Sequence, residues 1–225
     1  MEKNYYLVLD TETCPLTKSD KVDGYNMFVY DIGGAIVDKK GNVYETFSFV
    51  ISDIFQGEKD LMKSAYYANK LPKYVEELNN GTREMVTLYT ARKTVHELCK
   101  AYKVKAIIGH NMPFDYRTLQ NTQRWVTKSK YRNFFPYGIE IWDTMKMAED
   151  TICKQPTYKK WCEKTGHLTA RGSVRKTAEA LYRYISCEDT FMESHTALED
   201  VLIEKEIFAK CMAQHKKMRK SAFNR

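Results

Sequence analysis

Two carboxylates close an apolar segment near the start of the chain. Asp10 and Glu12 follow the β-prone run Tyr5–Leu9, which predicts a short buried strand. Residues two apart on a strand share a face, so the two charges lie together where burial costs several kcal/mol. A cation between them would offset that cost, and carboxylate oxygens favour Mg²⁺ or Mn²⁺. The alternative is a strand that runs into an acidic, solvated turn.

A second group of ionisable residues, a histidine and a carboxylate, lies near the other end of the chain. Thr196 and Glu199 have the spacing of a capping box, which predicts the start of a long helix. His195 then falls in the loop before this helix, and Asp200 falls in its first turns beside the apolar stripe. An inward Asp200 also needs a cation or a basic partner. The alternatives are an ordinary first-turn acid and an exposed histidine near the cap.

The elements between these residues predict a mixed sheet. Strand-like segments at 28–37 and 43–51, joined by a turn at 38–42, form an antiparallel meander with the first strand. Gly33 and Gly34 inside a strand predict the close approach of a neighbouring backbone. Helices are predicted over 85–102, 114–127 and 144–152, and further strands over 105–109 and 139–143. This order predicts an α/β fold with a five-stranded mixed sheet and helices on both faces.

The order of the strands also predicts where a site would lie. In such sheets ligands gather at the carboxyl ends of the strands. Asp10, Glu12 and Asp115 all lie at or just past such ends. Their convergence favours the metal-binding interpretation over the solvated turn.

The bulk composition is that of one compact protein. The 225 residues are 43% hydrophobic, and the formal net charge of +7 suggests a polyanionic partner. We expect a single domain over 1–214, a helical insert near 53–84, and a basic tail at 215–225, for which disorder is one alternative. Six scattered cysteines without a C-x-x-C pair predict reduced thiols. With no signal-peptide pattern and no apolar run of about 18 residues, we expect a cytoplasmic protein without membrane contact.

Three segments together resemble one enzyme family. They are 9–13 (LDTET), 110–119 (HNMPFDYRTL) and 195–200 (HTALED), and they look like the three motifs of the DEDDh 3′–5′ exonucleases. That family includes proofreading exonucleases, ribonuclease T and oligoribonuclease. The related subclass with a tyrosine four residues before the last Asp is excluded, because Thr196 occupies that position. The resemblance implies a ribonuclease H-like fold.

The resemblance also implies roles for individual residues. Asp10, Glu12, Asp115 and Asp200 match the ligands of two Mg²⁺ or Mn²⁺ ions, and His195 matches the general base, which binds no metal. Asp143 resembles a recurring Asp outside the four metal-binding acids, so we interpret it as a helix-capping or supporting residue. Thr13 and Asn111 are candidate contacts to the terminal nucleotide. One departure is Cys14–Pro15, where the family often has Thr-Gly.

The implied activity is the release of nucleoside 5′-monophosphates from the 3′ end of DNA or RNA. Two divalent ions would stabilise both the attacking water and the leaving oxygen, while a histidine accepts the proton. The partner would be a nucleic acid with a free 3′ end, in particular a single strand, and a polymerase or other replication protein is a further candidate. The alternative function is a nucleic-acid-binding or partner-binding module on an inactive copy of the fold.

Basic clusters with interleaved aromatic residues could form the binding surface, because phosphate contact and stacking hold single strands. The alternative is a solvated charged surface. The clusters are Arg124, Trp125, Lys128, Lys130, Tyr131 and Arg132; Lys154, Tyr158, Lys159, Lys160 and Trp161; Arg171, Arg175 and Lys176; and the segment 215–220.

Overall fold

The computed structural model describes residues 3–15, 27–63, 68–130 and 132–223. Its strands are β1 (Tyr5–Pro15), β2 (Met27–Asp38), β3 (Val43–Ile51), β4 (Glu84–Val86), β5 (Ala106–Gly109) and β6 (Glu140–Asp143). Its α-helices are α1 (Ser52–Phe55), α2 (Lys59–Met62), α3 (Leu71–Asn79), α4 (Leu88–Ala101), α5 (Met112–Thr127), α6 (Thr144–Asp150), α7 (Pro156–Thr165), α8 (Ala178–Ser186) and α9 (Ala197–Ala213). Two 3₁₀ turns span Ala68–Lys70 and Ile152–Lys154.

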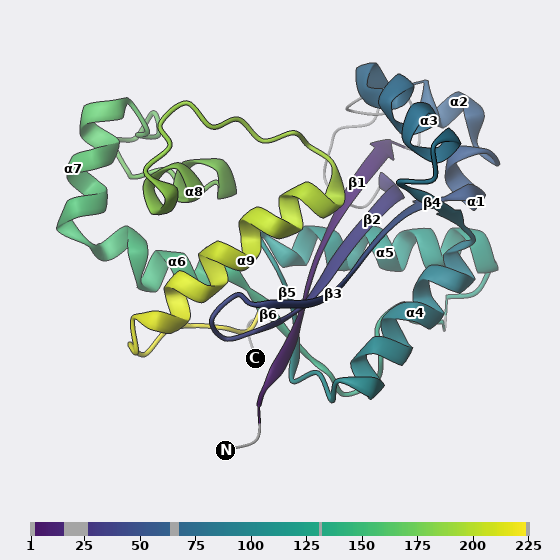
Figure 1. Ribbon diagram of the computed structural model, residues 1–225, viewed down its shortest axis with the longest axis horizontal. Helices are drawn as coiled ribbons and strands as arrows, with labels where there is room; N and C mark the ends of the chain where they lie inside the picture. Colours follow the sequence, from purple (N-terminus) through teal and green to yellow (C-terminus); the bar gives the residue numbers. More distant parts are fainter. Residues whose placement is uncertain (1–2, 16–26, 64–67, 131, 224–225) are drawn as a thin grey trace.

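The strands form one sheet in the order β4-β3-β2-β1-β5-β6. β1, β2 and β3 are an antiparallel meander, whereas β5 and β6 continue parallel to β1. Figure 1 shows α4 and α5 on one side of this sheet and α6 to α9 on the other. The predicted fold class is therefore confirmed.

The sheet has a sixth strand where the sequence predicted the start of a helix. Residues 84–86 pair parallel to β3 at the sheet edge, with Val50 opposite Met85. Helix α4 begins only at Leu88, because the Thr87 hydroxyl accepts the Thr90 backbone N–H as its cap. Met85 and Val86 fit a helical stripe as well as a strand, so pairing with β3 decides between the two.

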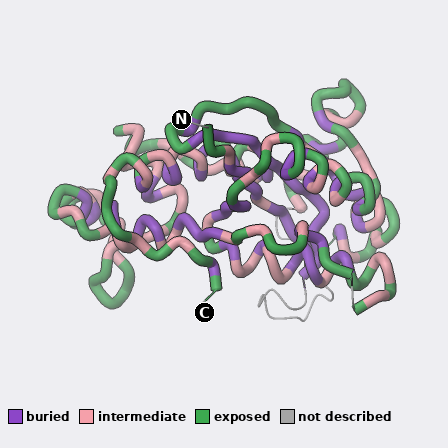
Figure 2. Tube along the Cα trace, turned by 90° about the horizontal axis from the view of Figure 1, so that it is seen from below, coloured by how far each residue is buried: buried purple, intermediate pink, exposed green. Residues whose placement is uncertain are grey.

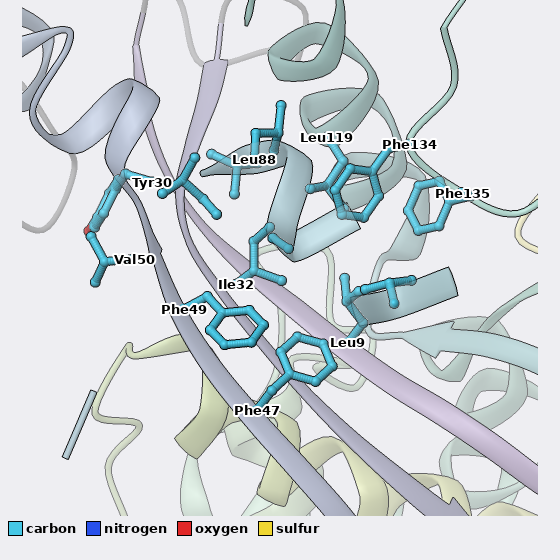
Figure 3. Close-up of a cluster of buried hydrophobic side chains, with 14 of the residues drawn as sticks. Leu9, Tyr30, Ile32, Phe47, Phe49, Val50, Leu88, Leu119, Phe134 and Phe135 are labelled. Carbon is cyan, nitrogen blue, oxygen red and sulfur yellow. The ribbon is translucent and has the colours of Figure 1, made fainter. Parts of the chain in front are cut away.

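Each face of the sheet has its own hydrophobic cluster. Figure 3 shows the cluster beneath α4 and α5, in which Leu9, Ile32 and Phe49 from three strands meet Leu88 and Leu119 from the helices. The opposite cluster joins Val8 and Ile108 of the sheet to Val201 and Phe208 of α9. Figure 2 shows these buried positions concentrated in the middle of the molecule. Both faces of β1 are thus covered by packed hydrophobic side chains.

The C-terminal segment lies against the other edge of the sheet. The Asp143 backbone N–H donates to the Lys220 carbonyl at 2.8 Å, and the Ala222 N–H donates to the Ile141 carbonyl at 2.9 Å. Arg219 also pairs with Glu149 and Asp150 of α6. Residues 219–222 of the predicted basic tail therefore cover the β6 edge.

Several further predictions concern local features. All six cysteines are free. In the part of the chain that the structure describes, no helix combines the length and apolarity needed to cross a bilayer. The largely polar segment 18–23, which follows the first predicted strand, predicts a loop, and it lies outside the described residues.

Candidate active site

The seven residues singled out in the sequence line one cavity of about 300 Å³. The cavity opens at the carboxyl end of β1, between the starts of α5 and α9. Its predicted lining residues are Asp10, Glu12, Thr13, Asn111, Asp115, His195 and Asp200. The convergence has a simple origin, since one strand end and two helix starts supply all of them. Their individual roles stay predictions.

The first two acids are presented by β1. Asp10 pairs across the sheet with Gly33 of β2, and Glu12 pairs with Asp31. A register shift follows directly after Glu12, so the strand bends at the cavity. Burial raises the pKa of Glu12 to about 9, and the charge of Asp200 adds to the shift. Burial, with the charge of Asp115 next in size, raises the pKa of Asp10 well above its usual value.

The third acid lies in the first turn of α5. The Thr11 hydroxyl donates a 2.7 Å hydrogen bond to Asp115 Oδ1, which orients the carboxylate. Burial raises the pKa of Asp115 to about 7, and the bond from Thr11 opposes the rise. The helix begins after Asn111, which has a left-handed backbone with φ 62°. The Asn111 N–H donates to Asp143 Oδ1 at 3.1 Å.

Asp143 has the capping role predicted for it. Its Oδ1 accepts the backbone N–H of Met145 at 2.9 Å, at the start of α6. The same oxygen accepts from Asn111, so one carboxylate joins the ends of β5 and β6. Asp143 therefore supports Asn111 at the start of α5, the helix that carries Asp115.

The remaining acid and the histidine come from the start of α9. Thr196 occupies the N-cap position of α9, but its side chain makes no capping hydrogen bond to the helix backbone. Its hydroxyl instead donates to the Glu199 carboxylate at 2.6 Å, so the capping box predicted from the spacing does not form. Asp200 Oδ1 is buried without a hydrogen-bond partner among the described residues. Burial raises the pKa of Asp200 to about 8, and Glu193 contributes further. Burial, followed by the charge of Lys70, lowers the pKa of His195.

The donor set fits a divalent cation. One ligand atom from each of Glu12, His195 and Asp200 lies within 4.8 Å of the other two. Desolvated carboxylates with raised pKa values repel one another, and a hard cation with oxygen ligands would relieve this repulsion. His195 lies near enough to take part, although the resemblance implied that it binds no metal. A metal ligand and a general base can be told apart by metal affinity, because loss of a ligand weakens metal binding and loss of the base does not.

Four residues around the cavity were not identified from the sequence. Glu193 and His110 line it, and His110 is held by Thr144 Oγ1 at 2.9 Å and the Lys176 carbonyl at 2.7 Å. Glu204 is 3% exposed on α9, and its Oε2 has no partner in the described part of the chain. Asp31 is fully buried in β2. Asp31 and Glu204 could have been identified from the sequence, because Asp31 interrupts an apolar strand and Glu204 falls on the apolar stripe of α9.

The aromatic residues of the predicted binding clusters differ in their exposure to solvent. Trp125 is 37% exposed, so part of its ring is accessible, although the Lys128 ammonium lies over the ring at 4.0 Å from the centroid. Tyr158, by contrast, is fully buried, so the prediction that it stacks with bases is wrong. Its hydroxyl donates to the Arg175 carbonyl in the core beneath α7. Tyr131 lies outside the described residues.

Comparisons with known proteins point to one kind of fold. No protein-family model and no curated protein matches the chain. The nuclease domain of 3′hExo, described as a DEDDh family member bound to rAMP, has a TM-score of 0.64 at 11% identity, covering 97% of this chain and 96% of that one. A full-length 3′-exonuclease gives 0.64 at 11% identity over 98% and 86%. Escherichia coli exonuclease I with a dT13 oligonucleotide gives 0.51 at 12% identity over 91% and 39%. The chain thus shares the fold of DEDDh exonucleases.

Proposed function

We propose that this chain is a DEDDh-type nuclease that removes nucleotides from the 3′ end of a nucleic acid and depends on divalent cations. One observation carries the proposal: four acids and a histidine from β1, α5 and the start of α9 line the same cavity. The fold shared with 3′-exonucleases supports it. A binding module without catalysis would not require five buried or half-buried ionisable groups to converge.

The acids would hold the ions. Asp10, Glu12, Asp115 and Asp200 offer the oxygen ligands, and two Mg²⁺ or Mn²⁺ ions would supply activation of the attacking water and stabilisation of the leaving oxygen. Thr11 holds the Asp115 carboxylate in its orientation. Thr13 and Asn111 border the same cavity, where they would contact the terminal nucleotide.

His195 would accept the proton of the attacking water. Burial and the charge of Lys70 lower its pKa, which favours the neutral imidazole that a general base requires. It precedes α9 with a left-handed backbone, φ 54°, at the edge of the cavity. The products would be nucleoside 5′-monophosphates.

The substrate class requires a direct test. One similar structure is bound to rAMP and another is in complex with a DNA oligonucleotide, so both nucleic acids are tested. We expect degradation of 5′-end-labelled strands in Mg²⁺ or Mn²⁺ from the 3′ end, single strands in particular, and none in EDTA. Labelled single- and double-stranded DNA and RNA provide the four arms. Release of the 5′ label as the first product contradicts the polarity, whereas tight binding without cleavage supports the inactive binding module. The polymerase or replication partner stays a prediction.

A further inference from the structure

A buried carboxylate outside the proposed catalytic set lies directly beside it. Asp31 on β2 is opposite Glu12 of β1 and has no exposed surface. Its Oδ2 accepts the Tyr74 hydroxyl at 2.7 Å and the Ala197 backbone N–H at 3.2 Å. Its Oδ1 accepts the Arg83 guanidinium at 2.8 Å. One carboxylate of β2 therefore joins two segments that are far apart in the sequence, the region of Tyr74 and Arg83 and the start of α9.

One of these segments is the start of α9. Ala197 is the first residue of that helix, so its N–H has no partner within the helix and needs an outside acceptor. Two residues further along β2, Gly33 has no Cβ, and a Cβ there would lie 2.6 Å from the Ala197 carbonyl oxygen. Asp31 and Gly33 together thus hold the turn that bears Asp200 and follows His195.

The other two partners belong to the helical insert near 53–84. Arg83 also donates through Nε to Glu77 Oε2 at 2.8 Å, and its guanidinium lies over the Tyr74 ring, 4.4 Å from the centroid. Lys73 on the same helix, α3, lies 3.4 Å from Glu199 in the first turn of α9. Figure 1 shows this insert beside the end of β1. The insert therefore contacts the start of α9 both directly and through Asp31.

Because both charges of the Asp31–Arg83 pair are buried, the docking of the insert and the position of the α9 start depend on each other. The Asp31 side chain is 0% exposed and that of Arg83 is 6% exposed. A buried ion pair adds little net stability, but removing one partner strands the other charge and is strongly unfavourable. Undocking of the insert would leave Asp31 uncompensated at the point where it accepts the Ala197 N–H.

We propose that the Asp31–Arg83 pair is a positioning device through which the insert holds the first turn of α9 against β1. Asp31, Arg83 and Tyr74 act through α9 and are positioning residues. The inference rests on the proposed function for the roles of Asp200 and His195. It assigns the insert to the construction of the active site.

The test replaces the whole network with apolar side chains. The triple variant Asp31→Leu, Tyr74→Phe, Arg83→Met avoids a stranded charge, so we expect it to fold, since a buried ion pair is often replaced without loss of stability. Amide hydrogen exchange is measured at 197–203 and, for reference, in β1 and β5. We expect at least tenfold faster exchange at 197–203 with β1 and β5 unchanged, and at least tenfold weaker Mn²⁺ binding by calorimetry. The control is Arg92→Met, which removes an arginine of α4 that donates to the Asn133 carbonyl.

Unchanged exchange at 197–203 in the folded triple variant would overturn the proposal and leave the pair a purely structural role. If the triple variant does not fold, Arg83→Lys is measured in the same way, because lysine keeps the charge but cannot bridge Asp31 and Glu77 as a fork. Faster exchange at 197–203 is again expected, and wild-type exchange contradicts the inference. If the wild-type chain binds no Mn²⁺, the proposed function fails, while the exchange measurement still decides the positioning role.

Discussion

Gly33 lies opposite Asp10 across the β1–β2 pairing, and the backbone of α9 at Ala197 and Leu198 rests directly on it. A side chain at Gly33 would come within 3.0 Å of that backbone. The sequence prediction of a close backbone approach at Gly33 is thereby confirmed. The contact places the helix that bears Asp200 against the strand pair that bears Asp10 and Glu12.

Gly33→Ala should push α9 away from β2. We expect a loss of about 1–3 kcal/mol in the free energy of unfolding, the usual cost of overpacking, together with about tenfold weaker Mn²⁺ binding. Denaturant unfolding and calorimetry measure the two effects. Gly172→Ala is the matched control, because nothing lies within 4 Å of a Cβ there, so only the cost of its positive φ remains. Wild-type Mn²⁺ affinity in Gly33→Ala would show that the contact does not set the site.

Asp10→Ala and Asp200→Ala should each abolish cleavage yet leave the metal-free protein as stable as the wild type or more stable. Both carboxyls have raised pKa values because of burial and neighbouring acids, so removing one relieves repulsion. Activity is followed on end-labelled strands in Mg²⁺, and the melting temperature is measured in EDTA. Full activity of either variant would refute the metal-ligand assignment.

His195→Ala should lower turnover by about 10²–10⁴-fold, the usual contribution of a general base. We expect Mn²⁺ binding and substrate affinity to be retained, and higher pH to restore part of the activity because hydroxide replaces the base. Single-turnover rates from pH 6 to about pH 9 measure this. A loss of Mn²⁺ affinity equal to that of Asp200→Ala would instead make His195 a ligand, as its closeness to Glu12 and Asp200 permits.

The metal-free protein should become less stable as pH rises. The pKa values of Asp115, Asp200 and Glu12 are raised to about 7, 8 and 9, above the ordinary values of 3.8 for Asp and 4.5 for Glu. The native state therefore binds more protons than the unfolded state between about pH 4 and pH 9, and stability falls through this window. Melting temperatures in EDTA should decline from pH 5 to pH 9, and Mg²⁺ should remove most of the slope. A slope that Mg²⁺ leaves unchanged would argue against a metal at these acids.

Glu204→Leu should stabilise the metal-free protein at pH 8 and have a smaller effect at pH 5. Burial raises the pKa of Glu204 well above its usual value, and Asp115 adds to the shift, so its ionisation costs stability as pH rises. Leucine also suits the buried face of α9, next to Val201 and Phe208. Thermal melts at the two pH values give the comparison, with exposed Leu202→Ala as a check on the helix itself. Lower stability of Glu204→Leu at pH 8 would mean that the ionised carboxylate is held by a favourable partner.

The sequence by itself determined the parts of this protein that depend on local pattern. Alternating and helical periodicities located five of the six strands and the helix that carries Asp200, because side-chain burial repeats every two residues in a strand and every 3.6 in a helix. The resemblance of three motifs to the DEDDh exonucleases selected Asp10, Glu12, Asp115, His195 and Asp200, and the order of strands predicted that Asp10, Glu12 and Asp115 converge. Asp143 was interpreted as a helix-capping or supporting residue because it resembles a recurring Asp of the DEDDh family outside the four metal-binding acids.

Only the tertiary structure decided which distant groups meet. Strand β4 exists because β3 offers an open edge, and residues 219–222 adopt their place because β6 offers the other. In the sequence, Asp31 is an unexplained acid within an apolar strand. In the folded chain, Arg83, 52 residues later, and Ala197, 166 residues later, donate hydrogen bonds to its carboxylate oxygens. Periodicity records whether a side chain is buried but not what it is buried against. A buried charge is tolerated only with the right partner, and for Asp31 that partner is supplied by the way the whole chain folds.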